Sequence, residues 1–138
     1  MLLIGASGYI GQHVAKSLLE RGYMPICPLR SNNPSFDKMN LRPEQAPVWD
    51  ITCESSINKV FNQNPDISTV ISCIASRTGG IRDSWMVDFE LNKSIMTAAK
   101  RFHVRKFVLL SAICVQKPVL NFQLAKLAFE KELKLSGL

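Results

Sequence analysis

Three glycines that follow the first apolar residues of the chain constrain its fold more than any other feature. They stand in the string Gly5-Ala6-Ser7-Gly8-Tyr9-Ile10-Gly11, directly after Leu2–Ile4. A helix is predicted next, because apolar residues recur at helical spacing at Ile10, Val14, Leu18 and Leu19. Gly22 marks its predicted end. A buried strand, a glycine turn and a helix form the first unit of a parallel α/β sheet.

The glycine turn has the layout of a phosphate cradle. Gly5 permits a tight turn, Gly8 lets backbone N–H groups approach a pyrophosphate, and Gly11 allows close helix packing. The helix N-terminus adds partial positive charge. The spacing is G-x-x-G-x-x-G, so a glycine turn without a ligand remains an alternative. The residues predicted to bind a dinucleotide here are Gly5, Ser7, Gly8, Tyr9, Ile10 and Gly11.

Strands and helices alternate along the rest of the sequence. Residues 31–47 are rich in Ser, Asn and Pro and predict a loop. The further predicted strands are Tyr23–Leu29, Val48–Ile51, Thr69–Ile74 and Lys106–Ala112, and the further helices are Ser55–Asn62, Ser84–Phe102 and Asn121–Leu135. This order predicts an α/β, Rossmann-type, doubly wound parallel sheet in one domain over residues 1–138.

Composition excludes several other classes of protein. With 138 residues and 46% hydrophobic content, the chain can bury one core. No apolar run approaches the roughly 18 residues of a membrane-spanning helix. The four cysteines are widely spaced without C-x-x-C pairs, so neither a metal site nor a disulfide framework is predicted. The net charge of +6 comes from scattered Lys and Arg residues, which does not favour a nucleic-acid partner.

Residues at the predicted strand ends indicate which dinucleotide fits. Arg30, followed by Ser31, ends the second strand where an acidic residue would favour NAD, so NADPH is the predicted cofactor. An exposed arginine that merely opens a loop is the alternative. Asp50 and Ile51 are predicted to flank the adenine, although Asp50 could equally cap the following turn.

The later strand ends supply the remaining candidates for the site. Ala75 and Ser76 follow the fourth strand and are predicted to lie along the cofactor path. Ser111 ends the fifth strand and Lys126 lies on the next helix, so both are candidate catalytic residues of a reductase. A helix cap and a solvated lysine are the simpler explanations of these two residues.

Two longer strings carry a specific resemblance. They are Ser72-Cys73-Ile74-Ala75-Ser76-Arg77-Thr78-Gly79-Gly80-Ile81-Arg82-Asp83-Ser84-Trp85 and Leu109-Leu110-Ser111-Ala112-Ile113-Cys114-Val115-Gln116-Lys117-Pro118. Together with Phe122-Gln123-Leu124-Ala125-Lys126, they resemble the divinyl chlorophyllide a 8-vinyl reductase family of atypical short-chain dehydrogenases/reductases. The resemblance runs through nearly the whole chain.

The resemblance implies NADPH-dependent reduction of an 8-vinyl group to ethyl on a magnesium tetrapyrrole, in chlorophyll biosynthesis. Related enzymes usually carry Tyr-x-x-x-Lys, and here Phe122 takes the tyrosine place while Lys126 matches and is expected to orient the cofactor. Arg77, Arg82 and Lys117 are candidate partners of a substrate carboxylate. Phe122 is expected to pack on the nicotinamide or the macrocycle, or else in the core.

The resemblance leaves other functions and the whole protein open. An NmrA-like NADP sensor without catalysis and an isoflavone-reductase-like enzyme are the alternatives. Family members continue into more strands and a substrate-binding part, so the chain is expected to be the N-terminal portion of a longer reductase. The family implies a chloroplast in a eukaryote or the cytoplasm of a bacterium, and it is compatible with peripheral contact with a photosynthetic membrane. It does not fix the oligomeric state.

Overall fold

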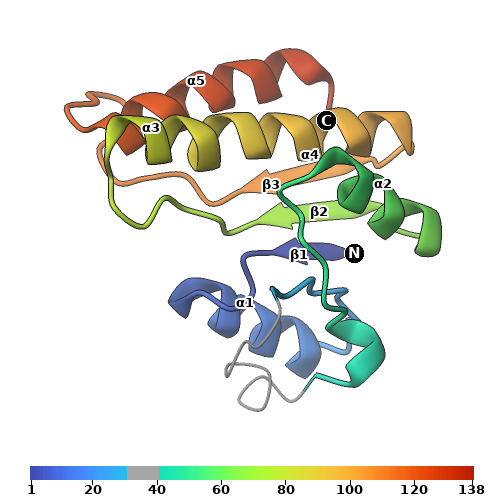
Figure 1. The fold of residues 1–138 in the computed structure, drawn as a ribbon. Helices are drawn as coiled ribbons and strands as arrows, with labels where there is room; N and C mark the ends of the chain where they lie inside the picture. Colours follow the sequence, from blue (N-terminus) through green and yellow to red (C-terminus); the bar gives the residue numbers. More distant parts are fainter. Residues whose placement is uncertain (31–40) are drawn as a thin grey trace.

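Three parallel strands form the centre of the molecule. The computed structural model describes residues 1–30 and 41–138. The strands are β1 (Leu2–Ile4), β2 (Thr69–Ser72) and β3 (Lys106–Leu109), and they lie in the order β1-β2-β3. Leu3 pairs with Ile71, and Ile71 pairs with Val108. The carboxyl ends of all three strands therefore meet at one edge of the sheet (Figure 1).

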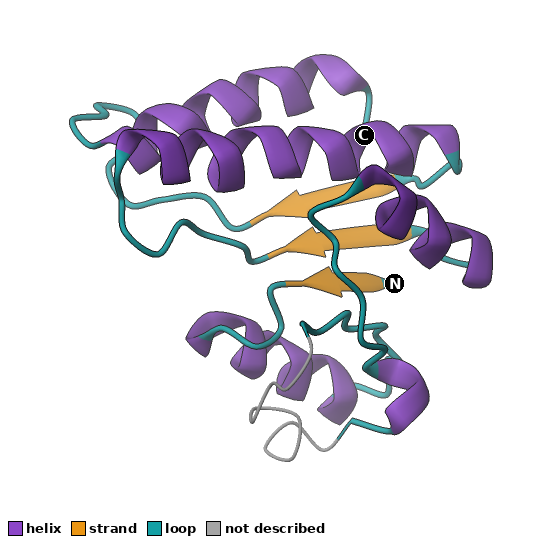
Figure 2. Ribbon diagram, in the orientation of Figure 1, coloured by secondary structure: helices purple, strands orange, loops and turns teal. Residues whose placement is uncertain are grey.

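Helices cover both faces of this sheet (Figure 2). A long helical segment after β2 changes its winding in the middle, because a π-helical turn joins two α-helical parts. The 3₁₀ helix Pro43–Gln45 precedes α2. The helices are α1 (Tyr9–Glu20), α2 (Glu54–Gln63), α3 (Ile81–Ser84), the π-helical turn η2 (Trp85–Leu91), α4 (Asn92–Arg101) and α5 (Asn121–Ser136).

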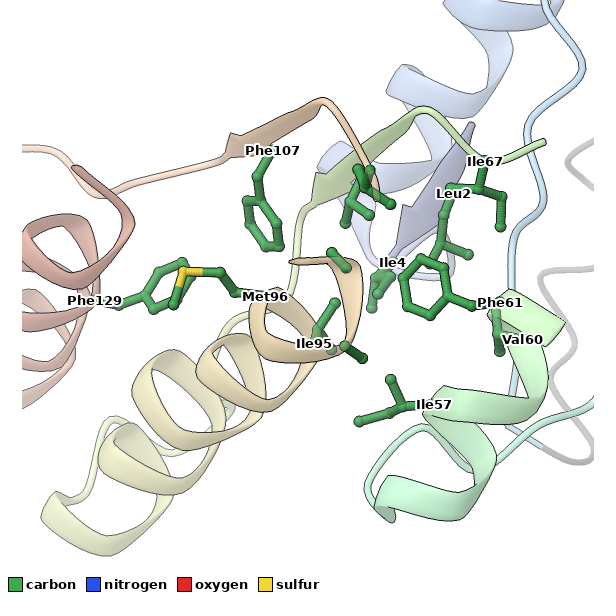
Figure 3. Close-up of a cluster of buried hydrophobic side chains, with 14 residues drawn as sticks. Leu2, Ile4, Ile57, Val60, Phe61, Ile67, Ile95, Met96, Phe107 and Phe129 are labelled. Carbon is green, nitrogen blue, oxygen red and sulfur yellow. The ribbon is translucent and has the colours of Figure 1, made fainter. Parts of the chain in front are cut away.

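The large cluster of apolar side chains fills the space between the sheet and helices α2, α4 and α5. Alternate strand residues point into it, as the two-residue period of a strand requires. Phe107 from β3 meets Phe129 from α5, with ring centroids 5.7 Å apart, and Met96 lies beside them (Figure 3). The buried members are Leu2, Ile4, Ile57, Val60, Phe61, Ile67, Val70, Ile95, Met96, Ala98, Ala99, Val104, Phe107 and Phe129.

The opposite face carries a smaller group, the α1-side cluster. Leu3 of β1 packs there against Ala15 of α1, and segments outside regular structure complete it. Its buried members are Leu3, Ala6, Ala15, Cys27, Leu29, Leu41 and Ala46. The two clusters on opposite faces confirm the predicted doubly wound arrangement.

Two predicted strands are wrong as continuous elements. Residues Tyr23–Leu29 and Val48–Ile51 contribute only the isolated parallel bridges Leu2↔Ile26 and Leu29↔Val48. Pro25, Pro28 and Pro47 lie in or beside these segments, and proline has no N–H to donate to a ladder. The bridges still align the segments beside β1 in the order expected of a doubly wound sheet.

The other predicted elements are present with shifted ends. β2 ends at Ser72 and β3 at Leu109, earlier than predicted. Beyond these ends the carbonyls of Ile74 and Leu110 accept hydrogen bonds from the Lys126 ammonium, so this part of the backbone bonds to a side chain. The helix after β2 begins at Ile81, before the predicted start.

Candidate functional site

The glycine turn between β1 and α1 is tight and leaves the helix start without a side-chain cap. Gly5 has φ +82°, in the left-handed region that favours glycine. The Gly8 N–H donates to the Gly5 carbonyl at 3.0 Å, and Gly8 is the N-cap of α1 with no side-chain cap hydrogen bond. No acidic residue stands in the first turn of α1. The first N–H groups of such a helix suit an anion.

The glycines of the turn meet different surroundings. A Cβ added at Gly11 would lie 2.0 Å from the Gly5 carbonyl oxygen, so α1 packs directly on the turn. A Cβ at Gly5 would lie 2.7 Å from the carbonyl carbon of Cys73 at the end of β2. At Gly8 the nearest atom would be 3.4 Å away, an ordinary contact. Packing within the chain therefore requires Gly5 and Gly11, whereas the exposed Gly8 leaves room for a ligand.

A cavity of about 450 Å³ opens at the carboxyl edge of the sheet above the glycine turn. Its volume lies within the usual range of small-molecule sites, about 300–1,000 Å³. It is lined by Gly5, Ser7, Gly8, Pro28, Arg30, Trp49, Ile51, Thr52, Cys73, Ile74, Ala75, Arg77, Asp83, Val87 and Leu91. The predicted residues Gly5, Ser7, Gly8, Arg30, Ile51 and Ala75 thus come together around one cavity.

Other predicted cofactor residues lie outside this lining. Tyr9 is 81% exposed and Ile10 is also exposed, both on the first turn of α1. Gly11 is buried against the glycine turn. Ser76 directs its backbone N–H toward the Asp88 carboxylate. Ser31 falls outside the described residues.

Asp50 caps a turn, which is the alternative that its sequence position left open. Its Oδ1 accepts hydrogen bonds from the Thr52 N–H at 3.0 Å and from the Thr52 hydroxyl at 2.6 Å. These two bonds, aided by the positive charge of Arg30, hold the pKa of Asp50 below its ordinary value. Arg30 itself lines the cavity near this carboxylate.

Lys126 is buried beneath the cavity. Its ammonium donates hydrogen bonds to the carbonyls of Ile74 at 3.0 Å and Leu110 at 3.1 Å, past the ends of β2 and β3. It also forms an ion pair with Asp88 Oδ1 at 3.2 Å, and the two side chains are only 3% and 0% exposed. Lys126 therefore lies behind the cavity wall.

Sequence reasoning missed Asp88 and Asn92, which stand one helical turn apart after β2. Asn92 donates its side-chain amide to the carbonyls of Val87 and Asp88 and accepts from the Ser72 hydroxyl at 2.6 Å. These bonds join the π-helical turn η2 to the end of β2, and such turns are frequent at functional sites. Two polar residues on the apolar side of the predicted helix were the available signal.

Ser111 does not face the cavity above the glycine turn. Its hydroxyl donates to Glu130 Oε1, and both residues line a second cavity of about 320 Å³ with Leu109, Leu133, Lys134 and Leu138. In the described structure Ser111 therefore lines a different cavity from the glycine turn, and its catalytic role stays a prediction. Ser111 is on the continuation of β3, and its side chain is directed toward α5.

The three candidate partners of a substrate carboxylate are separated. Arg77 lines the cavity above the glycine turn, whereas Arg82 and Lys117 are exposed and lie outside its lining. Near Arg77, the Asp83 carboxylate accepts from the Thr78 N–H and the Thr78 hydroxyl, each at 2.8 Å. Phe122 is half-buried in the first turn of α5 and lines neither cavity.

Two other kinds of feature are absent from the described ranges. Residues 1–30 and 41–138 hold no group of three or more His, Cys, Asp or Glu side chains that could bind a metal ion. In those same ranges no helix combines the length and apolar character needed to cross a membrane.

Curated relatives match almost the whole chain. A chloroplastic divinyl chlorophyllide a 8-vinyl-reductase from Arabidopsis thaliana is 41% identical over 141 residues, covering 96% of this chain and 34% of the relative. The enzyme of the same name from Zea mays is 40% identical, and the match covers 35% of its length. The chain thus spans about a third of the length of these relatives.

Solved structures share the fold at low identity. The UDP-glucose 4-epimerase of Thermotoga maritima, solved with UDP-glucose, has a TM-score of 0.80 at 19% identity. The match covers 98% of this chain and 50% of the epimerase chain. The UDP-glucuronic acid 4-epimerase of Bacillus cereus, solved with NAD, has a TM-score of 0.79 with the same coverage. Residues 1–131 match the NAD dependent epimerase/dehydratase family, and the chain belongs to that family.

Proposed function

We propose that this chain binds NADPH at the cavity above the glycine turn, and that it serves a reductase of the 8-vinyl group of divinyl chlorophyllide a. The observation that carries the proposal is the cavity itself, which joins the glycine turn, Arg30 and the end of β2. The family match supports a nicotinamide dinucleotide, and the relatives about 40% identical support the reductase. In this proposal residues 1–138 act as the dinucleotide-binding domain.

The residues present fit a dinucleotide phosphate. Gly8 is exposed at the N-cap of α1, where a Cβ would occupy the space above the turn. Ser7 and Gly8 line the cavity where the helix N-terminus supplies N–H groups and partial positive charge. In the proposed site these residues hold the pyrophosphate.

Arg30 favours NADPH over NADH. Arg30 lines the same cavity as Trp49 and Ile51, at the end expected to hold the adenosine. The nearby acidic residue, Asp50, accepts two hydrogen bonds from Thr52 and caps a turn. An arginine at this position suits a 2′-phosphate, which it can contact through paired N–H donors.

The proposed chemistry requires little acid–base catalysis from the described residues. The chemistry that the nicotinamide supplies when bound is hydride donation to one carbon of the vinyl group. The other vinyl carbon would then take a proton from water, which would complete the ethyl group; the loss of hydride accounts for NADP⁺ as the second product. Phe122 at the usual tyrosine position has no proton to give, and reduction of a carbon–carbon double bond forms no alkoxide that needs one.

Arg77 is the proposed contact for the carboxylate of the magnesium tetrapyrrole. It lines the cavity on the β2 side, whereas Arg82 and Lys117 are outside it. Its guanidinium can form charge-assisted hydrogen bonds to a carboxylate. Ser111, a candidate catalytic residue, and Lys117, a candidate carboxylate partner, lie outside this cavity and have no step in the proposal.

The decisive experiment is vinyl reduction by the protein expressed from its full reading frame. Divinyl chlorophyllide a is supplied with NADPH or with NADH, and formation of the 8-ethyl product is followed by chromatography and absorbance. The proposal predicts conversion with NADPH and much slower conversion with NADH. Tight NADPH binding without any conversion would instead favour the non-catalytic NADP sensor.

A further inference from the structure

An ion pair buried beneath the cofactor cavity has no part in the proposed chemistry. Lys126 of α5 and Asp88 of the turn η2 are 3.2 Å apart and almost completely shielded from water. Asp88 Oδ1 has no hydrogen-bond partner among the described residues, so the lysine charge is its main compensation. Burying two charges is expensive, and apolar residues of similar volume would often stabilise a fold as well or better. The pair therefore calls for a role beyond stability.

Two contacts of this pair hold one segment, Ile74–Arg77, which is named here the β2 loop. A third, from Lys126 to the Leu110 carbonyl at 3.1 Å, joins the pair to the chain beyond β3. Lys126 donates to the Ile74 carbonyl at 3.0 Å, and Asp88 Oδ2 accepts from the Ser76 N–H at 3.3 Å. The residue between these two anchors, Ala75, lines the cavity. The two buried charges thus hold the backbone on both sides of a residue that forms the cavity wall.

The β2 loop lies at the end of the cavity away from Arg30. The glycine turn follows β1, the segment with Arg30 bridges beside β1 on one side, and β2 pairs on the other. In a doubly wound sheet a dinucleotide crosses this point with its pyrophosphate at the turn after β1. If the adenosine lies toward Arg30, the nicotinamide half lies toward the β2 loop.

We propose that Asp88 is a positioning residue which, through Lys126 and the Ser76 N–H, holds the β2 loop in the shape that receives the nicotinamide half of the cofactor. This inference rests on the proposed NADPH site and goes beyond it. Lys126 then acts mainly through the loop it anchors. The two residues form one unit, so removing either side chain should lower the affinity for NADPH as much as removing both.

The test compares the binding of two probes by calorimetry. NADPH contains both halves of the cofactor, whereas 2′,5′-ADP lacks the nicotinamide riboside. For Asp88→Asn we expect NADPH affinity to fall about tenfold or more, as displacement of a positioning group can do. The affinity for 2′,5′-ADP should change less than about twofold, since its contacts lie on the Arg30 side.

A charge-neutral double variant guards against misfolding. Asp88→Asn with Lys126→Met leaves no uncompensated buried charge. The double variant should lose as much NADPH affinity as either single variant, because two residues that act as one unit give non-additive effects. Glu132→Gln is the matched control, because it removes the α5 carboxylate from the partly exposed ion pair between Lys93 of α4 and Glu132 of α5. That control should bind both probes like the unmodified chain.

Three results would overturn the inference. They are an equal loss for both probes, no loss for either probe, or a further loss when Lys126→Met is added to Asp88→Asn, which would indicate direct contact between the lysine and the cofactor. Failure of the unmodified chain to bind NADPH would contradict the proposed function itself, and this inference with it. Thermal unfolding of each variant, followed by circular dichroism, separates folding from binding.

Discussion

The two ends of the cofactor cavity differ in how firmly they are held. On the β2 side, regular strands pair along their lengths and a buried ion pair anchors the loop. On the Arg30 side, the walls are segments that join the sheet through isolated bridges, and the cluster beneath them is smaller. Where contacts are sparse, local opening requires less free energy. The Arg30 side should therefore adapt to a ligand, whereas the β2 side is preformed.

The largest expected effect on stability is at Gly11, where α1 packs directly on the backbone of the glycine turn. Gly11→Ala would place a Cβ 2.0 Å from the Gly5 carbonyl oxygen, and backbone at that distance cannot yield without displacing α1. We expect a loss of more than about 4 kcal/mol in the free energy of unfolding. Urea denaturation followed by circular dichroism measures it.

Gly8→Ala is the matched variant within the same turn. Its Cβ makes only a 3.4 Å contact, so stability should fall by about 1 kcal/mol or less while NADPH binding is largely lost. Equal instability of the two variants would show that Gly8 serves packing, as Gly11 does.

The next effect tests the large cluster. Phe129 is fully buried between α5 and β3, and Phe129→Ala should lower the free energy of unfolding by about 3–5 kcal/mol. Leu135→Ala on the same helix is the control, because Leu135 is 87% exposed. A difference below about 1 kcal/mol between the two variants would contradict the view that this face holds the fold together.

Cysteine labelling compares the two faces directly. Burial raises the pKa of the Cys27 thiol to about 12, so in the folded chain it should react very slowly with an alkylating reagent. We expect Cys27 to become reactive at a lower urea concentration than a thiol introduced by Ala99→Cys in the large cluster, because the α1 side opens first. Mass spectrometry of peptides resolves each site. Simultaneous labelling of both would mean that the faces unfold together.

The smallest effect concerns Asp83 near Arg77. Hydrogen bonds from the Thr78 backbone and hydroxyl hold the pKa of Asp83 below its ordinary value. Their contribution to loop stability is present above the ordinary carboxyl pKa and is lost as the pH falls through the lowered one. Thr78→Val should raise the pKa of Asp83 and Thr78→Ser should not, which carboxyl NMR can measure. An unchanged value in Thr78→Val would assign the shift to the backbone alone.

Local features of the sequence were sufficient to predict the glycine turn, because strand, glycines and helix are consecutive. Continuous strands were predicted at Tyr23–Leu29 and Val48–Ile51 because these segments contain β-forming residues. The prolines in and beside them lack the N–H that a strand ladder needs, and only isolated bridges form. The buried ion pair of Lys126 could not be predicted. Its partner Asp88 is distant in sequence, and only the pairing of β2 with β3 brings α5 and η2 together.

We propose that the cavity above the glycine turn is an NADPH site whose selectivity over NADH lies at Arg30. The most direct measurement is calorimetric titration of the chain with NADPH and with NADH, repeated on Arg30→Ala. We predict tighter binding of NADPH by the unmodified chain, and a variant that loses about tenfold or more in NADPH affinity while NADH binding changes little. Equal affinities for the two dinucleotides that Arg30→Ala leaves unchanged would contradict the account.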